Sequence, residues 1–118
     1  MRPLALLATF AAAVAATAAP AKLEFNRDVR PILSDKCFKC HGPDSQARKA
    51  DRRLDVREAA LAELDGVRAI VPGMPEQSEL VHRIESSDPD EQMPPRKSNL
   101  RLSKDEIAVL RRWVAEGA

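Results

Sequence analysis

Apolar residues recur at helical spacing near both ends of the chain. Ahead of the two cysteines, Phe25, Val29, Ile32 and Leu33 fall on one side of a helix. Pro31 lies within this stretch, and proline is tolerated in the first turn of a helix. We therefore expect a helix that starts close to Pro31 and leads into the cysteines.

The clearest helical pattern lies at the end of the chain. Ser103 and Glu106 have the spacing of a capping box, in which each side chain accepts a hydrogen bond from the other residue's backbone N–H. Gly117 favours a stop after the last turn. The apolar stripe between them consists of Ile107, Leu110, Trp113 and Val114.

The middle of the chain predicts two shorter helices. Asp55 and Glu58 have the spacing of a second capping box, for a helix over residues 56–64 that Gly66 closes. Residues 78–85 predict a short helix whose inner side carries Leu80, Val81 and Ile84.

The remaining segments predict turns and loops. Residues 71–75 contain two prolines and a glycine and predict a rigid turn, whereas residues 44–53 and 86–99 are polar and predict surface loops. No segment alternates apolar and polar residues as a half-buried strand does. The predicted fold class is therefore all-α, with long loops.

The start of the chain is typical of a secretory signal peptide. Arg2 supplies a positive charge, residues 4–16 are apolar or small apart from Thr9, and small residues follow up to Ala21. A retained membrane anchor is the alternative, but the run is short for a span of about 20 apolar residues. We expect residues 1–21 to be removed, an exported and periplasmic location, and one domain over residues 22–118 with no membrane span.

Charge and composition narrow the function classes. The chain has 19 basic and 18 acidic residues, and Arg2 is the only charge in the predicted signal. A mature chain without excess charge gives no reason to expect nucleic acid or an anionic membrane as partner. Large side chains for a core are also scarce. The chain has three Phe, one Trp and no Tyr, and Phe10 belongs to the predicted signal. A bound cofactor would help to fill such a core.

The only two cysteines form a motif with a histidine. Cys37 and Cys40 are separated by two residues, and His41 follows directly. Cys-x-x-Cys-His is typical of a c-type haem attachment site. Two thiols about one helical turn apart can each add to one vinyl group of the porphyrin, and the histidine then acts as the proximal iron ligand.

Three other uses of these residues are weaker. A thioredoxin-like redox pair belongs to a βαβ setting, which the pattern does not predict. An exported location allows a disulfide, but so short a loop would constrain the chain very little. A zinc site needs four ligands, which Cys37, Cys40, His41 and His82 would have to supply.

A second axial ligand has to come from elsewhere in the chain. Met93 is followed by two prolines, which fix the backbone around its thioether. Met74, His82 and a five-coordinate iron are the alternatives. An open iron would make the domain a sensor or peroxidase-like enzyme, able to bind oxygen, nitric oxide or peroxide.

Several motifs together resemble the planctomycete-type cytochrome c domain, over nearly all of residues 24–118. They are residues 25–33, 37–44, 53–55, 71–80 and 93–95. The resemblance implies a cytochrome c fold, in which an N-terminal helix carrying the haem motif packs with a C-terminal helix around the haem. It also implies thioether bonds at Cys37 and Cys40, with His41 and Met93 as the proximal and distal iron ligands.

The expected function is transfer of single electrons between exported donor and acceptor proteins, or to a tethered redox domain. The cofactor would be haem c, and the iron would be the only metal. No catalytic nucleophile or acid–base pair stands out, so we expect a carrier and not an enzyme. Arg96 and Lys97, just after Met93, are candidates to pair with haem propionates. Members of this family usually continue into further domains, so the chain is expected to be either a free-standing carrier or part of a longer protein.

Overall fold

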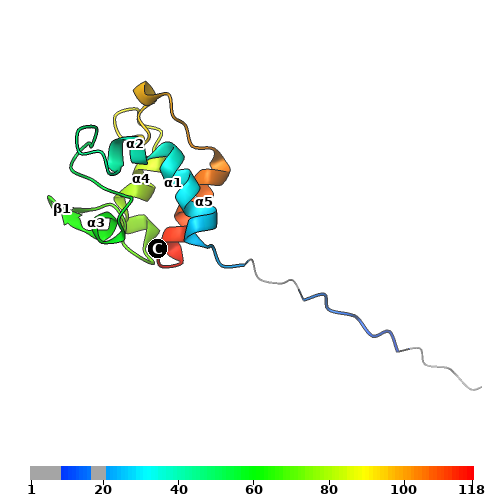
Figure 1. Cartoon of the computed structure of the whole chain (residues 1–118). Coiled ribbons are helices and arrows are strands. Elements are labelled where there is room, and N and C mark those ends of the chain that lie inside the picture. Colours follow the sequence, from blue (N-terminus) through cyan, green and yellow to red (C-terminus); the bar gives the residue numbers. More distant parts are fainter. Residues whose placement is uncertain (1–8, 17–20) are drawn as a thin grey trace, which may run out of the picture.

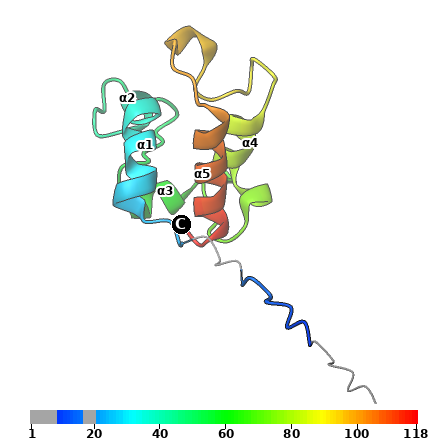
Figure 2. The same ribbon diagram turned by 90° about the vertical axis from the view of Figure 1, so that its right-hand side faces the viewer.

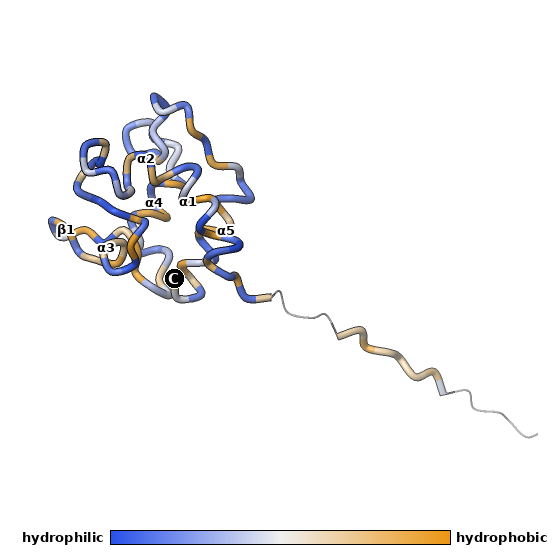
Figure 3. Tube along the Cα trace, viewed as in Figure 1, coloured by the Kyte–Doolittle hydropathy of each residue, from blue (hydrophilic) through white to orange (hydrophobic). Residues whose placement is uncertain are grey.

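The computed structural model describes residues 9–16 and 21–118. Most of the predicted signal peptide, residues 1–8 and 17–20, lies outside the described residues. Residues 9–16 form a hydrophobic extended stretch away from the folded part (Figures 1 and 3), and the side chain of Phe10 is 99% exposed. Among the described residues, no helix is both long and apolar enough to span a bilayer.

The N-terminal helix leads into the cysteines as expected. A π-helical turn, η1 (Phe25–Val29), continues as α1 (Arg30–Lys36), with Pro31 in its first turn. The short helix α2 (Phe38–His41) follows directly. Val29 and Leu33 are fully buried, so the apolar face predicted from helical spacing is the face that enters the core.

The terminal helix α5 (Lys104–Ala115) packs against η1 and α4. Its predicted capping box is confirmed: the Glu106 N–H donates to Ser103 Oγ (3.1 Å), and the Ser103 N–H donates to Glu106 Oε1 (2.9 Å). The rings of Phe25 and Trp113 meet with their centroids 5.6 Å apart. The two ends of the domain therefore hold each other, as the cytochrome c fold implies (Figure 2).

The helix expected over residues 56–64 is only partly correct. Helix α3 (Arg57–Leu61) is shorter and has no side-chain cap, because its N-cap is Val56, which has no acceptor, and the carboxylate of Asp55 pairs with Arg53 (2.6 Å). The chain then forms a small antiparallel hairpin of β1 (Glu63–Leu64) and β2 (Val67–Arg68). Asp65 and Gly66 both have positive φ, 51° and 78°, which is the geometry of a type I′ hairpin turn. Gly66 thus turns a hairpin and does not end a helix.

The segment from residue 71 to 85 follows the prediction. The turn closes with the Met74 N–H donating to the Val71 carbonyl (3.0 Å), and the short 3₁₀ turn η2 (Pro75–Gln77) comes next. Helix α4 (Glu79–Glu85) then buries Leu80, Val81 and Ile84. A long loop containing the 3₁₀ turn η3 (Arg96–Ser98) connects α4 to α5.

The core is aliphatic. Eleven hydrophobic residues of the described chain are buried, and all of them are Ala, Val, Leu or Ile. Phe38 and Trp113 are only partly buried at its margin. The mostly helical fold confirms the predicted class, and the lack of a fully buried aromatic ring agrees with the poor supply of large side chains in the sequence.

Candidate functional site

The two cysteines and the histidine lie on one helical turn. The Cys37 N–H donates to the Leu33 carbonyl (2.8 Å), and the His41 N–H donates to the Cys37 carbonyl (2.9 Å). Both cysteines are free thiols of intermediate exposure. The motif therefore continues the helix of α1, with the two cysteines about one turn apart.

The loop after the motif folds back onto it. The Lys49 N–H donates to the Cys40 carbonyl and the Leu54 N–H donates to the His41 carbonyl, both at 2.8 Å. Gly42 allows this return because a Cβ atom there would collide with the backbone carbonyl of Phe38. The loop thus covers the carbonyl end of α2 with its own backbone.

His41 is held in one orientation by the backbone of this loop. Its Nδ1 lies 3.2 Å from the carbonyl oxygen of Arg52. A carbonyl can only accept a hydrogen bond, so Nδ1 carries the proton and Nε2 keeps its lone pair. Burial lowers the pKa of His41, and the carbonyls of Arg52 and Lys49 offset part of this effect. The imidazole is therefore in the neutral form that binds metals.

Cys37, the first residue of the motif, is partly buried against the core. Burial raises the pKa of its thiol to about 12, with smaller contributions from Cys40 and Glu106. Ile32, Phe38, Leu102 and Ile107 are among the partly buried residues that pack with it against the core. The Cys37 side of the motif is thus part of the apolar margin of the core.

Met93 is held against α4 by its own backbone and by Glu91. The Met93 N–H donates to the Arg83 carbonyl (3.1 Å). Two residues earlier, the Glu91 carboxylate lies 3.1 Å from His82 Nε2 and accepts a hydrogen bond from Ser86 Oγ (3.3 Å). The connecting loop is therefore fastened to α4 just before it reaches Met93.

A pocket adjoins Met93 on the side of α5. Figures 1 and 2 both place the loop that carries Met93 at the same end of the molecule as α2, which carries His41. The pocket combines apolar residues with two arginines. Its lining includes Ile84, Met93, Leu102, Ile107, Arg96 and Arg101.

The family model described as Planctomycete cytochrome C matches residues 37–97, from Cys37 to just beyond the Met-Pro-Pro segment. The chain belongs to the planctomycete cytochrome c family. This membership implies haem-based electron transfer. The comparisons with curated proteins and with solved structures returned no match.

The residues of this planctomycete cytochrome fit a covalently bound haem. Two free thiols stand one turn apart, and a neutral imidazole with an available Nε2 follows the second of them. These are the groups that form two thioether bonds and one axial iron bond. A disulfide does not join the cysteines, and the β1–β2 pair is the only sheet among the described residues, so the thioredoxin-like interpretation lacks its βαβ unit.

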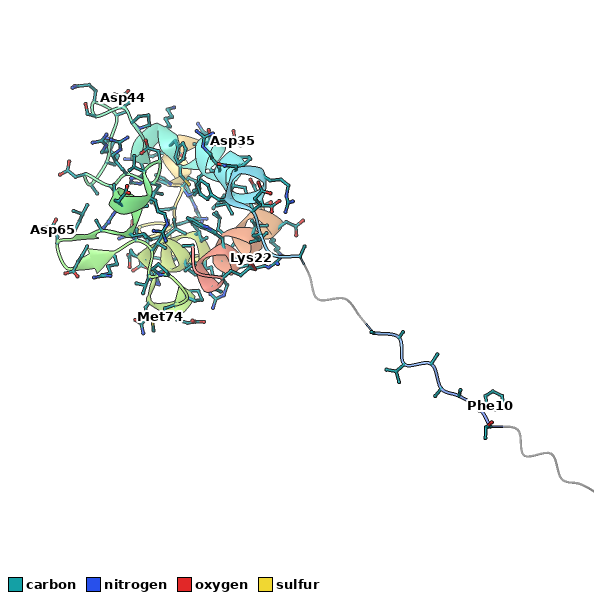
Figure 4. All side chains as sticks on the ribbon, turned by 60° about the horizontal axis from the view of Figure 1, so that its bottom comes forward. Phe10, Lys22, Asp35, Asp44, Asp65 and Met74 are labelled. Carbon is teal, nitrogen blue, oxygen red and sulfur yellow. The ribbon has the colours of Figure 1, made fainter. Side chains whose placement is uncertain are left out.

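The other candidate ligands are less suited. Met74 is 44% exposed and lies at the opposite edge of the folded part from Asp44, which follows the haem motif closely (Figure 4). The side chain of His82 is 54% exposed and contacts Glu91. Within residues 9–16 and 21–118, no group of three or more His, Cys, Asp or Glu side chains is arranged to hold a metal ion. The zinc interpretation therefore has no support in the described part of the chain.

Sequence reasoning missed two arginines of the site. Arg101 lines the pocket beside Met93 together with Arg96, whereas Lys97 is not among the lining residues. Arg52 contacts His41 through its carbonyl. Every residue type has a backbone carbonyl, so no pattern in the sequence indicates this contact.

Proposed function

We propose that this cytochrome domain carries haem c on Cys37 and Cys40, with His41 and Met93 as axial ligands, and transfers single electrons. The observation that supports it most is the hydrogen bond from His41 Nδ1 to the Arg52 carbonyl. It leaves Nε2 free to bind iron, one residue after two free thiols.

Each residue then has a defined task. Cys37 and Cys40 would hold the haem through thioether bonds, the S–H of each thiol adding across one vinyl C=C bond so that sulfur goes to one carbon and hydrogen to the other. His41 would offer the lone pair of Nε2 to the iron while the Arg52 carbonyl accepts the hydrogen bond from Nδ1–H. The haem, when bound, supplies an iron that alternates between the Fe(II) and Fe(III) states.

Met93 and its surroundings would set the reduction potential. A thioether ligand raises the potential relative to two nitrogen ligands, and apolar surroundings raise it further. The loop that holds Met93 adjoins Ile84, Leu102 and Ile107. Arg96 and Arg101 in the same pocket would attract the haem propionates.

The predicted signal peptide, residues 1–21, supports export to the periplasm, where c-type haem attachment takes place. The partners in this proposal are exported electron donors and acceptors, or a redox domain tethered to this one. The near balance of 19 basic and 18 acidic residues gives neither a nucleic acid nor an anionic membrane an advantage as partner.

Mass spectrometry tests the attachment directly. The full chain is expressed with haem-maturation machinery, purified, and treated with acidic acetone. We expect the polypeptide to keep a mass increase of one haem. A variant with both Cys37→Ser and Cys40→Ser should lose its haem to the solvent, whereas Ser45→Ala, in the following loop, should keep it.

A purified native protein of unmodified mass would overturn the proposal. A covalent haem in a protein whose N-terminus still carries residues 1–21 would leave the attachment intact and disprove the predicted cleavage.

A further inference from the structure

Arg52 has two separate roles in the structure, one for its backbone and one for its side chain. Its carbonyl accepts the hydrogen bond from His41 Nδ1 (3.2 Å). Its guanidinium donates to the carbonyl of Ala62 (2.9 Å) and to the carbonyl of Val67 (3.0 Å). One residue therefore connects the imidazole to the β1–β2 hairpin.

The two side-chain bonds depend on the shape of the guanidinium. Ala62 lies just before β1 and Val67 lies in β2, so the two accepting carbonyls belong to opposite arms of the hairpin. The planar guanidinium presents two N–H groups in a fixed fork that reaches both. A lysine ammonium has the same charge but is a single point, which cannot reproduce both bonds at once.

The loop that carries Arg52 is also bonded to α2 on either side of this residue, by the Lys49 N–H at the Cys40 carbonyl and by the Leu54 N–H at the His41 carbonyl. The backbone N–H of Arg52 donates to Lys49 (3.1 Å) within the same loop, and Ala50 and Asp51 both have a φ of 53°. Such left-handed residues mark a tight turn and do not tie it to the rest of the protein. Beyond these backbone bonds to α2, the hairpin is the separate element that Arg52 itself contacts through its side chain.

We infer that Arg52 is a positioning residue for the proximal histidine, and that the hairpin holds the His41 imidazole in place through the Arg52 guanidinium. This inference rests on the proposed haem ligation by His41. The hydrogen bond on Nδ1 makes the imidazole a stronger donor to the iron, so weakening it favours Fe(II) and raises the midpoint potential.

The test follows the His41 ring N–H in the haem-loaded, reduced protein. Hydrogen exchange of this proton is measured by NMR, and the midpoint potential is measured on the same samples. In the native protein the ring N–H should exchange slowly. Arg52→Lys should accelerate exchange by about tenfold or more, as expected for the weakening of one buried hydrogen bond. Its midpoint potential should rise, and since the charge is retained, this shift cannot come from the loss of a cation.

Two further variants separate positioning from a general loss of stability. Gly66→Ala strains the hairpin turn at a φ of +78° without touching Arg52, and it should also accelerate exchange, by a smaller factor. Arg53→Lys is the matched control, because it also keeps the charge and this neighbouring guanidinium hydrogen-bonds to the Asp55 carboxylate and to neither arm of the hairpin. It should leave both the exchange rate and the potential unchanged.

Three results would overturn the inference. They are a ring N–H that exchanges freely in the native protein, an Arg52→Lys variant with native exchange and potential, and an Arg53→Lys variant that shifts as much as Arg52→Lys. A native protein without covalent haem would instead contradict the proposed function itself, so the two failures are distinguishable.

Discussion

At the scale of single residues, the two proposed iron ligands, His41 and Met93, are held in place in different ways. The His41 ring is fixed by a bond from its own Nδ1 to a backbone carbonyl. Met93 is held through its backbone N–H, so its thioether is positioned by the loop and not by a bond to the side chain. The proposed role of Met93 therefore depends on its sulfur atom, and a substitution that keeps the volume of the side chain can test it.

Replacing Met93 with leucine should remove the distal ligand and preserve packing, since the two side chains have similar volumes. We expect the ferric protein to lose the charge-transfer band between methionine sulfur and Fe(III), and its midpoint potential to fall. Added imidazole should bind at least about tenfold more tightly, because it no longer competes with the thioether. Visible spectra recorded during an imidazole titration measure both effects.

Met74→Leu is the control, since Met74 is 44% exposed and lies outside the pocket at Met93. A native protein without the band would show that Met93 is not the ligand, and the open-iron alternative would then apply.

Helix α4 is the element that places Met93. It buries Leu80, Val81 and Ile84 in the core and uses its outer side to hold the loop that follows. Glu91 makes much of this contact. Its carboxylate hydrogen-bonds with His82 and Ser86, and its backbone carbonyl accepts a hydrogen bond from the Arg83 guanidinium (3.4 Å). The helix thus connects the core to the proposed distal ligand.

Glu91→Gln should loosen this loop without unfolding the domain. The pair between Glu91 and His82 is partly exposed, so its loss should cost about 0.5–1 kcal/mol. Imidazole should then displace Met93 with an affinity about two- to fivefold higher than in the native protein. Glu85→Gln is the matched control, because Glu85 pairs with Arg111 of α5 (2.7 Å) and does not contact the loop. Equal affinities in the Glu91→Gln variant and the native protein would rule out this restraint.

The middle of the chain shows where prediction at the scale of elements failed. The hydrophobic spacing of residues 78–85 and 103–117 identified α4 and α5, because each presents one apolar stripe to the core. Residues 56–68 have a helical start but contain Asp65 and Gly66, the residue pair that most favours a two-residue hairpin. The turn geometry prevailed over the helical pattern, and Asp55 was engaged by Arg53 instead of capping the helix.

At the scale of the whole molecule, a charged cluster within the N-terminal segment makes stability depend on pH. Asp28 accepts hydrogen bonds from Arg27 and from the backbone N–H of Glu24 (2.8 Å), and the pKa of its carboxyl is lowered to about 2. The bond to Arg27 is the main cause. Asp55 has a lowered pKa for the same reason, through Arg53.

Acid should therefore remove the contribution of Asp28 to stability. A carboxyl whose pKa is lower when folded stabilises the protein above its unfolded pKa of about 4, and this contribution disappears as the pH falls through about 2. We expect Asp28→Asn to unfold more easily than the native protein at pH 6, and the difference to shrink between about pH 4 and pH 2. Thermal unfolding at a series of pH values measures this difference.

Asp90→Asn, at an exposed position of the loop after α4, should differ little from the native protein at any pH. A difference between Asp28→Asn and the native protein that stays constant from pH 6 to pH 2 would contradict the assignment.

The sequence by itself determined the haem motif, the two capped or amphipathic helices that follow it, and the family. These depend on short spacings, such as Cys37 to His41 and Ser103 to Glu106, which local geometry fixes. Only the tertiary structure decided which carbonyl accepts the hydrogen bond from His41, where the Arg52 side chain binds, and what holds the loop at Met93. Those contacts join residues 9 to 11 positions apart across turns of the chain, often through backbone atoms, and the identities of the side chains do not encode them.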